Sequence, residues 1–292
     1  MHDSTGYYIS DIFQQRSILV KKCYRSVCTI IDASPAVDDM VFTVLMNHHK
    51  NVLKVLGCCL DLKVPAIIYE IGINYGRLYD LLFRRKDGNI GNNIGRSLSW
   101  SNRLKIATDV ANALVYLHTA FPTPIIHRDI TTGNIVIDSN GVAKLVDFSS
   151  CVALPPGESQ VEVPIVGTFG HNEPDYMTTG IITEKSDVYV FGIILLQLLT
   201  ALKAWDLNTQ DRHLEGPEYN PLVAYVSNHV DKNELSKILD PMILEERGEI
   251  EHQLQAFSRL ALRCTVVRAA DRPYIIDVAK ELVRIQRSVH PI

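Results

Sequence analysis

Two groups of polar residues, separated by a predicted β-hairpin, constrain the fold of this chain more than any other feature. The first group is His127-Arg128-Asp129, followed by four residues and then Asn134; the second is Asp147-Phe148-Ser149, which begins thirteen residues after Asn134. Between the groups, short apolar runs flank Ser139-Asn140-Gly141, a pattern that predicts two strands joined by a tight turn. Because the order, the spacing and the flanking strands agree, we interpret both groups as parts of one site.

The residue types in these groups suit the transfer of a phosphoryl group. That reaction needs a carboxylate near the attacking hydroxyl and oxygen ligands for Mg²⁺. Asp129 can supply the first, and Asn134 and Asp147 can supply the second. Lys21, at the end of a short apolar run, can neutralise phosphate charge. Each residue alone has an ordinary alternative: Lys21 as a solvated strand lysine, and Asp129 as a residue that holds its own loop by hydrogen bonds.

Composition and charge exclude several classes of protein. With 47% hydrophobic and 21% charged residues the chain is globular, and its net charge of −4 does not suit a general nucleic-acid binder. The longest apolar run, Val188 to Leu202, is too short to cross a bilayer and predicts a buried helix. The six cysteines indicate reduced thiols rather than a disulfide framework. We therefore expect no nucleic-acid partner, no transmembrane segment and a cytoplasmic location.

The distribution of strand and helix signals predicts an α+β fold with two lobes. Residues 17–22 and 65–69 are short, β-branched apolar runs typical of strands, whereas helical periodicity dominates later in the chain. We expect a small strand-rich lobe over about residues 1–72 and a larger helical lobe over about residues 73–292. The connection between them is predicted near Glu70 to Asn74.

The first polar group matches the catalytic loop of protein kinases, and the second resembles their metal-binding Asp-Phe-Gly motif. The resemblance extends from about Gly6 to the end of the chain, and it implies a bilobal kinase-like fold that binds ATP and Mg²⁺. It also implies that Asp129 stands at the proton-acceptor position and that Lys21 binds phosphate. Asn134 and Asp147 would hold the metal.

Other segments resemble further parts of a kinase. The connection at Glu70-Ile71 would contact the nucleotide, and Thr168 and Asp175 fall in what looks like the end of an activation segment. Asp187 stands in a segment that resembles the central helix, where an aspartate normally braces the catalytic loop. Arg272 lies where kinases pair an arginine with an activation-segment carboxylate, here Asp175.

The closer resemblance is to plant receptor-like cytoplasmic kinases. Residues 51–60 and 183–189 are typical of that group, and residues 167–176 and 218–223 resemble its ZRK subgroup. Members of this subgroup are largely pseudokinases of plant innate immunity. The resemblance implies two kinds of partner, a nucleotide-binding leucine-rich-repeat receptor and other receptor-like cytoplasmic kinases. It also implies a cytoplasmic protein that reaches the plasma membrane through its partners.

Two departures from an active kinase concern the surroundings of Lys21. No glycine-rich loop precedes it, and the chain begins too late for the first strand of the small lobe, so ATP would lose much of its positioning. No glutamate lies between Lys22 and Glu70, so the lysine is expected to lack its usual ion-pair partner. Asp38, Asp39 or Met40 falls at that helix position.

Three further substitutions affect the nucleotide and the transferred group. Leu19 replaces the small residue that roofs the adenine, and overpacking of this kind typically costs about 1–3 kcal/mol. Thr131 replaces a lysine that offsets transition-state charge, and losing such a donor typically costs about 10²–10³ in rate. Ser149 replaces glycine and restricts the backbone behind Asp147.

Taken together, these departures predict catalysis that is absent or residual, with weak or absent binding of ATP and Mg²⁺. Two alternatives stay open. The retained Asp129, Asn134 and Asp147 suit a working serine/threonine kinase that transfers the ATP γ-phosphate to protein hydroxyls. The second alternative is that Met1 is not the natural start and that an upstream segment supplies the glycine-rich loop.

Overall fold

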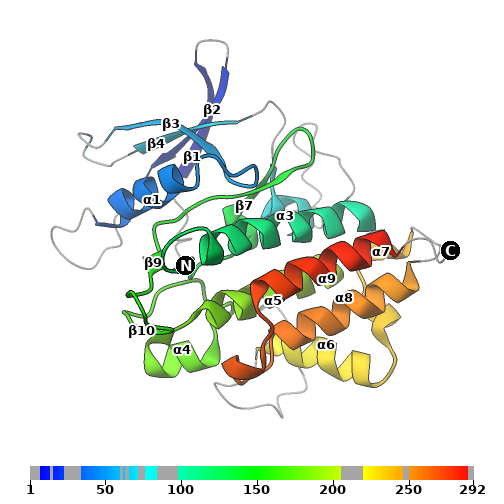
Figure 1. Ribbon diagram of the computed structural model, residues 1–292. Helices are drawn as coiled ribbons and strands as arrows, with labels where there is room; N and C mark the ends of the chain where they lie inside the picture. The colour runs from blue at the N-terminus through cyan, green and yellow to red at the C-terminus, as the bar shows by residue number, and fades with distance from the viewer. Residues whose placement is uncertain are drawn as a thin grey trace.

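The computed structural model describes residues 7–13, 16–22, 34–59, 62, 66–71, 76–83, 98–204, 220–245 and 250–288. These residues form a strand-rich N-terminal lobe and a larger helical C-terminal lobe, as Figure 1 shows. The predicted α+β fold is confirmed. Most of the predicted connection between the lobes, namely residues 72–74, lies outside the described residues.

The N-terminal lobe is a four-stranded antiparallel sheet with one helix. Its elements are β1 (Tyr7–Phe13), β2 (Arg16–Lys22), α1 (Ser34–Leu45), β3 (Lys54–Cys59) and β4 (Ala66–Glu70). The sheet order is β1-β2-β4-β3, and the register places Leu19 opposite Tyr69 and Lys21 opposite Ile67. Strands β2 and β4 confirm the two predicted runs. Strand β1 was not predicted, because Ser10-Asp11 interrupts its apolar residues.

The C-terminal lobe combines long helices with short strand pairs. Its helices are α2 (Leu78–Phe83), α3 (Trp100–Thr119), α4 (Pro174–Thr179), α5 (Glu184–Thr200), α6 (Pro221–Asp231), α7 (Pro241–Leu244), α8 (Glu251–Cys264) and α9 (Ile275–Arg287). Its strands are β5 (Gly76–Arg77), β6 (Ile125–Ile126), β7 (Ile135–Ile137), β8 (Ala143–Leu145), β9 (Val152–Ala153), β10 (Val161–Glu162) and β11 (Ile181–Ile182). Single 3₁₀ turns occur at Thr132–Asn134, Leu235–Lys237 and Ala269–Asp271.

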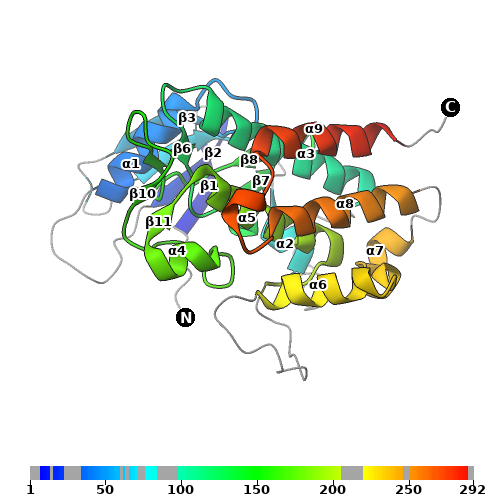
Figure 2. The ribbon, with the colours of Figure 1, turned by 60° about the horizontal axis from the view of Figure 1, so that its bottom comes forward.

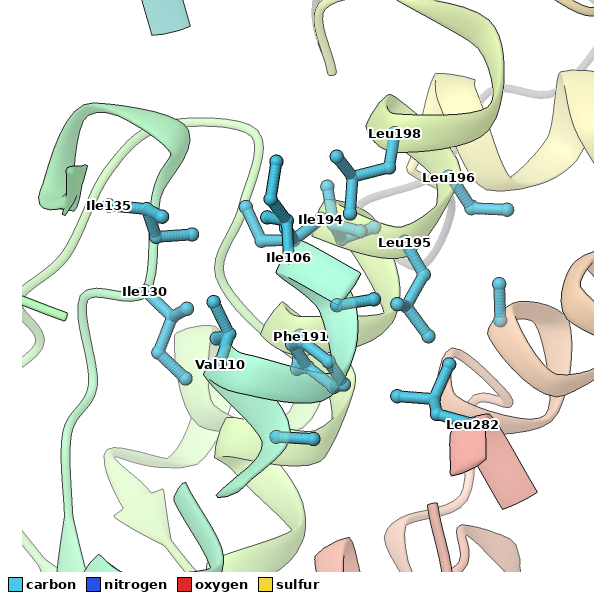
Figure 3. Packing of buried hydrophobic residues seen from close by; sticks show 14 of the residues in the cluster. Ile106, Val110, Ile130, Ile135, Phe191, Ile194, Leu195, Leu196, Leu198 and Leu282 are labelled. Carbon is cyan, nitrogen blue, oxygen red and sulfur yellow. The ribbon is translucent and has the colours of Figure 1, made fainter. Parts of the chain in front are cut away.

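Helix α5 forms the centre of this lobe. Its residues from Ser186 to Thr200 are all buried, which confirms the helix predicted from the apolar run. Figure 3 shows Phe191, Ile194 and Leu195 of α5 among side chains from α3 and α9. Within the described part of the chain, no helix is both long and apolar enough to cross a membrane.

The predicted hairpin between the two polar groups is present as β7 and β8. Ile135 pairs with Leu145, and the turn has Gly141 at a φ of 71°, in the left-handed region that glycine tolerates. The Asp138 carboxylate accepts hydrogen bonds from the backbone N–H groups of Asn140 and Val142, both at 2.9 Å. The turn is therefore stabilised locally, as its sequence predicts.

Candidate active site

The segment between β6 and β7 carries Asp129 and Asn134, the first two residues of the predicted site. The Nδ2 group of Asn134 donates to the Asp129 backbone carbonyl at 3.0 Å and to its Oδ2 at 3.2 Å. Thr168, which is distant in sequence, donates its hydroxyl to Asp129 Oδ1 at 2.7 Å. The structure therefore brings the predicted activation-segment residue Thr168 directly onto the predicted proton acceptor.

Asp187 of α5 holds the backbone of the segment between β6 and β7. Its carboxylate accepts hydrogen bonds from the backbone N–H of His127 at 2.9 Å and of Arg128 at 3.0 Å, and it contacts His118 Nε2 at 2.8 Å. Burial opposes ionisation of this carboxyl, but the His118 hydrogen bond and the neighbouring imidazoles outweigh it, so its pKa is lowered. Asp187 thus holds the backbone at His127 and Arg128 in the position expected of a bracing residue, and His118 is a partner that the sequence did not reveal.

The environment of Asp129 makes it a weaker acid than an exposed aspartate. Burial raises its pKa to about 6, although the hydrogen bonds from Thr168 and Asn134 act in the opposite direction. A carboxyl group with this pKa can both accept and release a proton near neutral pH. This acidity is compatible with the predicted role of Asp129 as proton acceptor.

Lys21 lies between two buried carboxylates. Its side chain is 3% exposed, and its Nζ is 2.6 Å from Asp39 Oδ2 and 2.6 Å from Asp147 Oδ1. Asp39 also accepts a hydrogen bond from the backbone N–H of Phe148 at 2.7 Å. We call Lys21, Asp39 and Asp147 the buried lysine network.

This network shows which of the three predicted helix positions faces Lys21 in place of the usual glutamate. Asp39 of α1 takes the place of the expected glutamate, while the neighbouring Met40 is partly buried against the apolar cluster that contains Leu19. The shorter aspartate reaches the lysine because its carboxylate also binds the backbone at Phe148, which holds α1 close to the metal-binding motif. The sequence left three positions open because helix phase cannot be fixed without knowing where α1 begins.

The two carboxyl groups of the network differ in acidity. Complete burial raises the pKa of Asp39. Burial also opposes ionisation of Asp147, but the Lys21 ammonium and the hydroxyl of Ser149 outweigh this effect and lower its pKa. Ser149 Oγ donates to Asp147 Oδ1 at 2.6 Å, so the serine in place of glycine adds a side-chain hydrogen bond at the predicted metal-binding position.

Leu19, at the position predicted to roof the adenine, belongs to a buried apolar cluster. Leu19 is 1% exposed and belongs to a buried group that spans β2, β4 and the hairpin, namely Leu19, Leu53, Ile67, Tyr69, Ile71, Val136 and Val146. The side chain of Glu70 pairs with Lys54 across β3 and β4 at 3.2 Å. Leu19 therefore packs where the sequence predicts crowding, and Ile71 lines the same cluster.

The residues at the predicted metal site fit Mg²⁺. Asn134 Oδ1 is buried and has no hydrogen-bond partner in the described part of the chain, as expected of an oxygen reserved for a ligand. Asp147 supplies a carboxylate, although Lys21 and Ser149 both bind its Oδ1. The described residues contain no cluster of three or more His, Cys, Asp or Glu side chains suited to a metal. Asn134 and Asp147 would thus hold the ion without a third such ligand.

The arginine of the C-terminal lobe pairs with a different carboxylate from the one predicted. Arg272 is buried and forms an ion pair with Glu173, which immediately precedes α4, whereas Asp175 is exposed in the first turn of that helix. The longer glutamate side chain reaches the buried guanidinium, which also stacks against the Tyr189 ring at 4.9 Å. The prediction for Asp175 was therefore wrong.

The sequence comparison decides the family. The profile of the family described as protein tyrosine and serine/threonine kinase matches residues 8–282 of this chain. The chain belongs to this family.

Relatives of this kinase-domain protein include members of the ZRK group of Arabidopsis thaliana. The "Non-functional pseudokinase ZED1" is 37% identical over 97% of this chain and 83% of its own length. The "Serine/threonine-protein kinase ZRK1" is 38% identical over 86% of this chain and 69% of its own length. The resemblance to the ZRK subgroup is therefore confirmed.

Larger plant receptors carry a similar domain. The "Wall-associated receptor kinase 3" of Arabidopsis thaliana is 38% identical over 88% of this chain but only 33% of its own length. This chain thus spans about a third of that receptor and corresponds to part of it.

Compared with an active member of the family, the site keeps the acidic and amide residues but lacks the groups that offset phosphate charge. Asp129, Asn134 and Asp147 converge as the family requires. Thr131 is buried and supplies no cation beside Asp129, and β1 and β2 contain no glycine to approach a phosphate. The geometry therefore allows proton transfer and metal binding but provides little charge for a triphosphate.

Proposed function

We propose that this protein is a pseudokinase, with phosphoryl transfer absent or residual, that acts as an adaptor in plant innate immunity. It would connect a nucleotide-binding leucine-rich-repeat receptor with other receptor-like cytoplasmic kinases, in the cytoplasm and at the plasma membrane through these partners. The name of ZED1 as a non-functional pseudokinase supports the first part of this proposal. The ZRK resemblance supports the second.

The charge balance of the site carries the proposal. Ion pairs join the ammonium of Lys21 to Asp39 and Asp147, and the same ammonium acts electrostatically on Asp129. A triphosphate is strongly anionic, and in an active site its charge is offset by several cations. Here Lys21 is already paired twice, and Thr131 offers no second positive charge. ATP would therefore bind weakly.

A second candidate function is that of a working serine/threonine kinase. The uncommitted Asn134 Oδ1 favours it, because this atom suits Mg²⁺, and so does the name of ZRK1 as a serine/threonine-protein kinase. When bound, Mg²⁺ would neutralise phosphate charge. Asp129 would then accept the proton of a protein hydroxyl, held in place by Asn134 and Thr168.

Two measurements on the purified protein separate these functions. We expect a melting temperature that rises by less than about 1 °C with millimolar Mg·ATP, since a ligand stabilises the folded state only if it binds it. We also expect no phosphate incorporation from radiolabelled ATP, into itself or into myelin basic protein, above that of Asp129→Asn. Incorporation that Asp129→Asn abolishes would establish the kinase function instead.

The adaptor role needs its own test. Tagged protein isolated from plant tissue is expected to contain a nucleotide-binding leucine-rich-repeat receptor and at least one receptor-like cytoplasmic kinase, identified by mass spectrometry. A tagged kinase domain of a wall-associated receptor kinase serves as the control. Equal recovery of both partner classes by that control would contradict the adaptor role.

A further inference from the structure

The exposed side of α1 is entirely aliphatic in the part of the helix whose side chains the structure describes. Val37, Val41, Val44 and Leu45 are between 37% and 52% exposed, and no other described residue of α1 is exposed. Their spacing of three and four residues places them on one side of the helix. Helix α1 lies at the left of the N-terminal lobe in Figures 1 and 2.

This composition is unusual for a surface helix, which normally presents polar residues to water. The inner side of α1 is already used within the protein. Asp39 and Thr43 are completely buried, and Met40 and Phe42 pack against the buried apolar clusters. The aliphatic residues on the other side of the helix therefore have the composition of a contact surface rather than of a solvated one.

The two ends of this side carry charges of opposite sign. Asp38 lies near the N-terminal end of α1, and the exposed Lys50 follows its C-terminal end. Lys144 of β8 adds a second cation there, because its Nζ donates to the Lys50 backbone carbonyl at 2.7 Å. From Met40 to Asn47 the sequence contains no charged residue. We call Val37, Asp38, Val41, Val44, Leu45 and Lys50 together the α1 face.

We infer that the α1 face binds the α1 face of a second copy of this chain, with the two helices antiparallel about a two-fold axis. This arrangement sets the Asp38 end of one helix beside the Lys50 end of the other, so opposite charges meet at both ends. Val44 lies midway between these two positions and Val41 one turn before it, so aliphatic side chains pack at the centre. A partner with charges of one sign would instead meet a like charge at one end.

The size of the α1 face predicts a reversible dimer. Valine side chains are short and allow two helices to approach to the separation of about 8–10 Å that is typical of packed helices. Four partly exposed aliphatic side chains, however, form a smaller contact than the interface of about 800 Å² per partner found in stable complexes. We therefore expect a Kd in the micromolar range. The inference does not depend on whether the protein is a pseudokinase or an adaptor.

Sedimentation velocity of the purified protein, from about 1 to 200 μM and without nucleotide, tests the inference. We expect the sedimentation coefficient to rise with concentration toward that of a dimer. Val41→Lys should raise the Kd about tenfold or more, because it brings two like charges together at the centre of the contact. Ile276→Lys is the matched control, since Ile276 is 40% exposed on α9 of the other lobe, and it should leave the Kd unchanged. A wild type that stays monomeric, or an equal loss of association in the control, would overturn the inference.

A mixture of two charge variants tests whether two copies of the same face meet. Val41→Lys and Val41→Glu should each be monomeric alone and should associate when mixed, because opposite charges then face each other across the axis. Failure of the mixture to associate would refute the two-fold arrangement. A monomeric wild type, together with a plant protein that co-purifies with it but not with Val41→Lys, would assign the face to that protein and overturn the inference. Unchanged circular dichroism shows that each variant is folded.

Discussion

At the scale of single residues, Asp39 is notable because its side chain connects three separate elements. Its carboxylate binds both the Lys21 ammonium and the backbone N–H of Phe148, so one side chain connects α1, β2 and the metal-binding motif. A fully buried charge is tolerated only when it is paired and hydrogen-bonded. Asp39 satisfies both conditions, and this explains how a charged residue can be completely buried there.

Replacement of Asp39 by alanine is predicted to destabilise the protein by about 2–4 kcal/mol, because it leaves the Phe148 N–H without an acceptor and Lys21 with one carboxylate fewer. Urea unfolding followed by circular dichroism measures the loss. Glu245→Gln, on an exposed residue after α7, should change stability by less than about 0.5 kcal/mol. Equal stabilities of Asp39→Ala and the wild type would show that the network contributes nothing.

Asp129 predicts a specific dependence of stability on pH. Its pKa of about 6 in the folded protein lies above the model-compound value of 3.8, so between these values the folded state holds a proton that the unfolded state releases. The stabilisation from this proton is complete below about pH 4 and is lost as the pH rises through 6. The unfolding free energy should therefore fall by up to about 3 kcal/mol over this range, since each pKa unit corresponds to about 1.4 kcal/mol.

The Asp129→Asn variant lacks this titration. Its stability relative to the wild type should increase from pH 4 to pH 7 and stay constant at higher pH. Urea unfolding of both proteins at four pH values checks this. Parallel stability curves would mean that the carboxyl group titrates normally in the folded protein.

At the scale of elements, the segment from β9 to α4 is held by contacts with three separate parts of the lobe. Strand β9 pairs with β6, β10 pairs with β11, and Glu173 before α4 pairs with Arg272 near the start of α9. Arg272 also donates to the backbone carbonyls of Val266 and Val267. The segment is thus ordered by contacts that involve no phosphate group.

Loss of the Glu173 ion pair is predicted to destabilise the protein more than loss of the nearby Asp175 carboxylate. Glu173→Ala should cost about 3–5 kcal/mol, because it leaves a buried guanidinium without its counter-charge. Asp175→Ala, two residues later on the exposed face of α4, should cost less than about 0.5 kcal/mol. Thermal unfolding of both variants provides the comparison, and a larger loss for Asp175→Ala would restore the pairing predicted from sequence.

At the scale of the whole molecule, the two lobes are connected by the hairpin as well as by the chain. Asn51 lies between α1 and β3. Its side-chain Nδ2 donates to the Ala143 backbone carbonyl at 3.0 Å, and its backbone carbonyl accepts from the Leu145 N–H at 2.8 Å. Lys144 Nζ donates to the Lys50 carbonyl at 2.7 Å. These bonds couple the N-terminal lobe to β8 of the hairpin, so the lobes are expected to unfold together.

Asn51→Ala should weaken this coupling. The Nδ2 bond to Ala143 is buried, so its loss should cost about 1–3 kcal/mol and raise hydrogen exchange in β3 and β4 more than in α5. Asn102→Ala, at an exposed position on α3, is the control and should leave exchange unchanged. Uniform acceleration across both lobes would show that Asn51 stabilises the molecule globally rather than at this contact.

Much of this organisation could be read from short patterns. The hairpin turn at Ser139-Asn140-Gly141, the buried α5 and the two polar groups depend on residues close in sequence, and local chemistry specifies them. The role of Asp187 was implied by the resemblance to kinases, and Asn134 reaches Asp129 because only a short loop and one 3₁₀ turn separate them.

Which residues pair with one another over long sequence distances could be determined only from the tertiary structure. Asp39 rather than Met40, and Glu173 rather than Asp175, pair with their cations because helix phase and side-chain reach depend on packing between elements. The same holds for the hydrogen bond of Ser149 to Asp147 and the exposure of Phe169. Sequence spacing specifies which chemical groups are present, but charges and apolar groups interact through space, and only the packing of α1, the hairpin and α4 brings particular ones within reach.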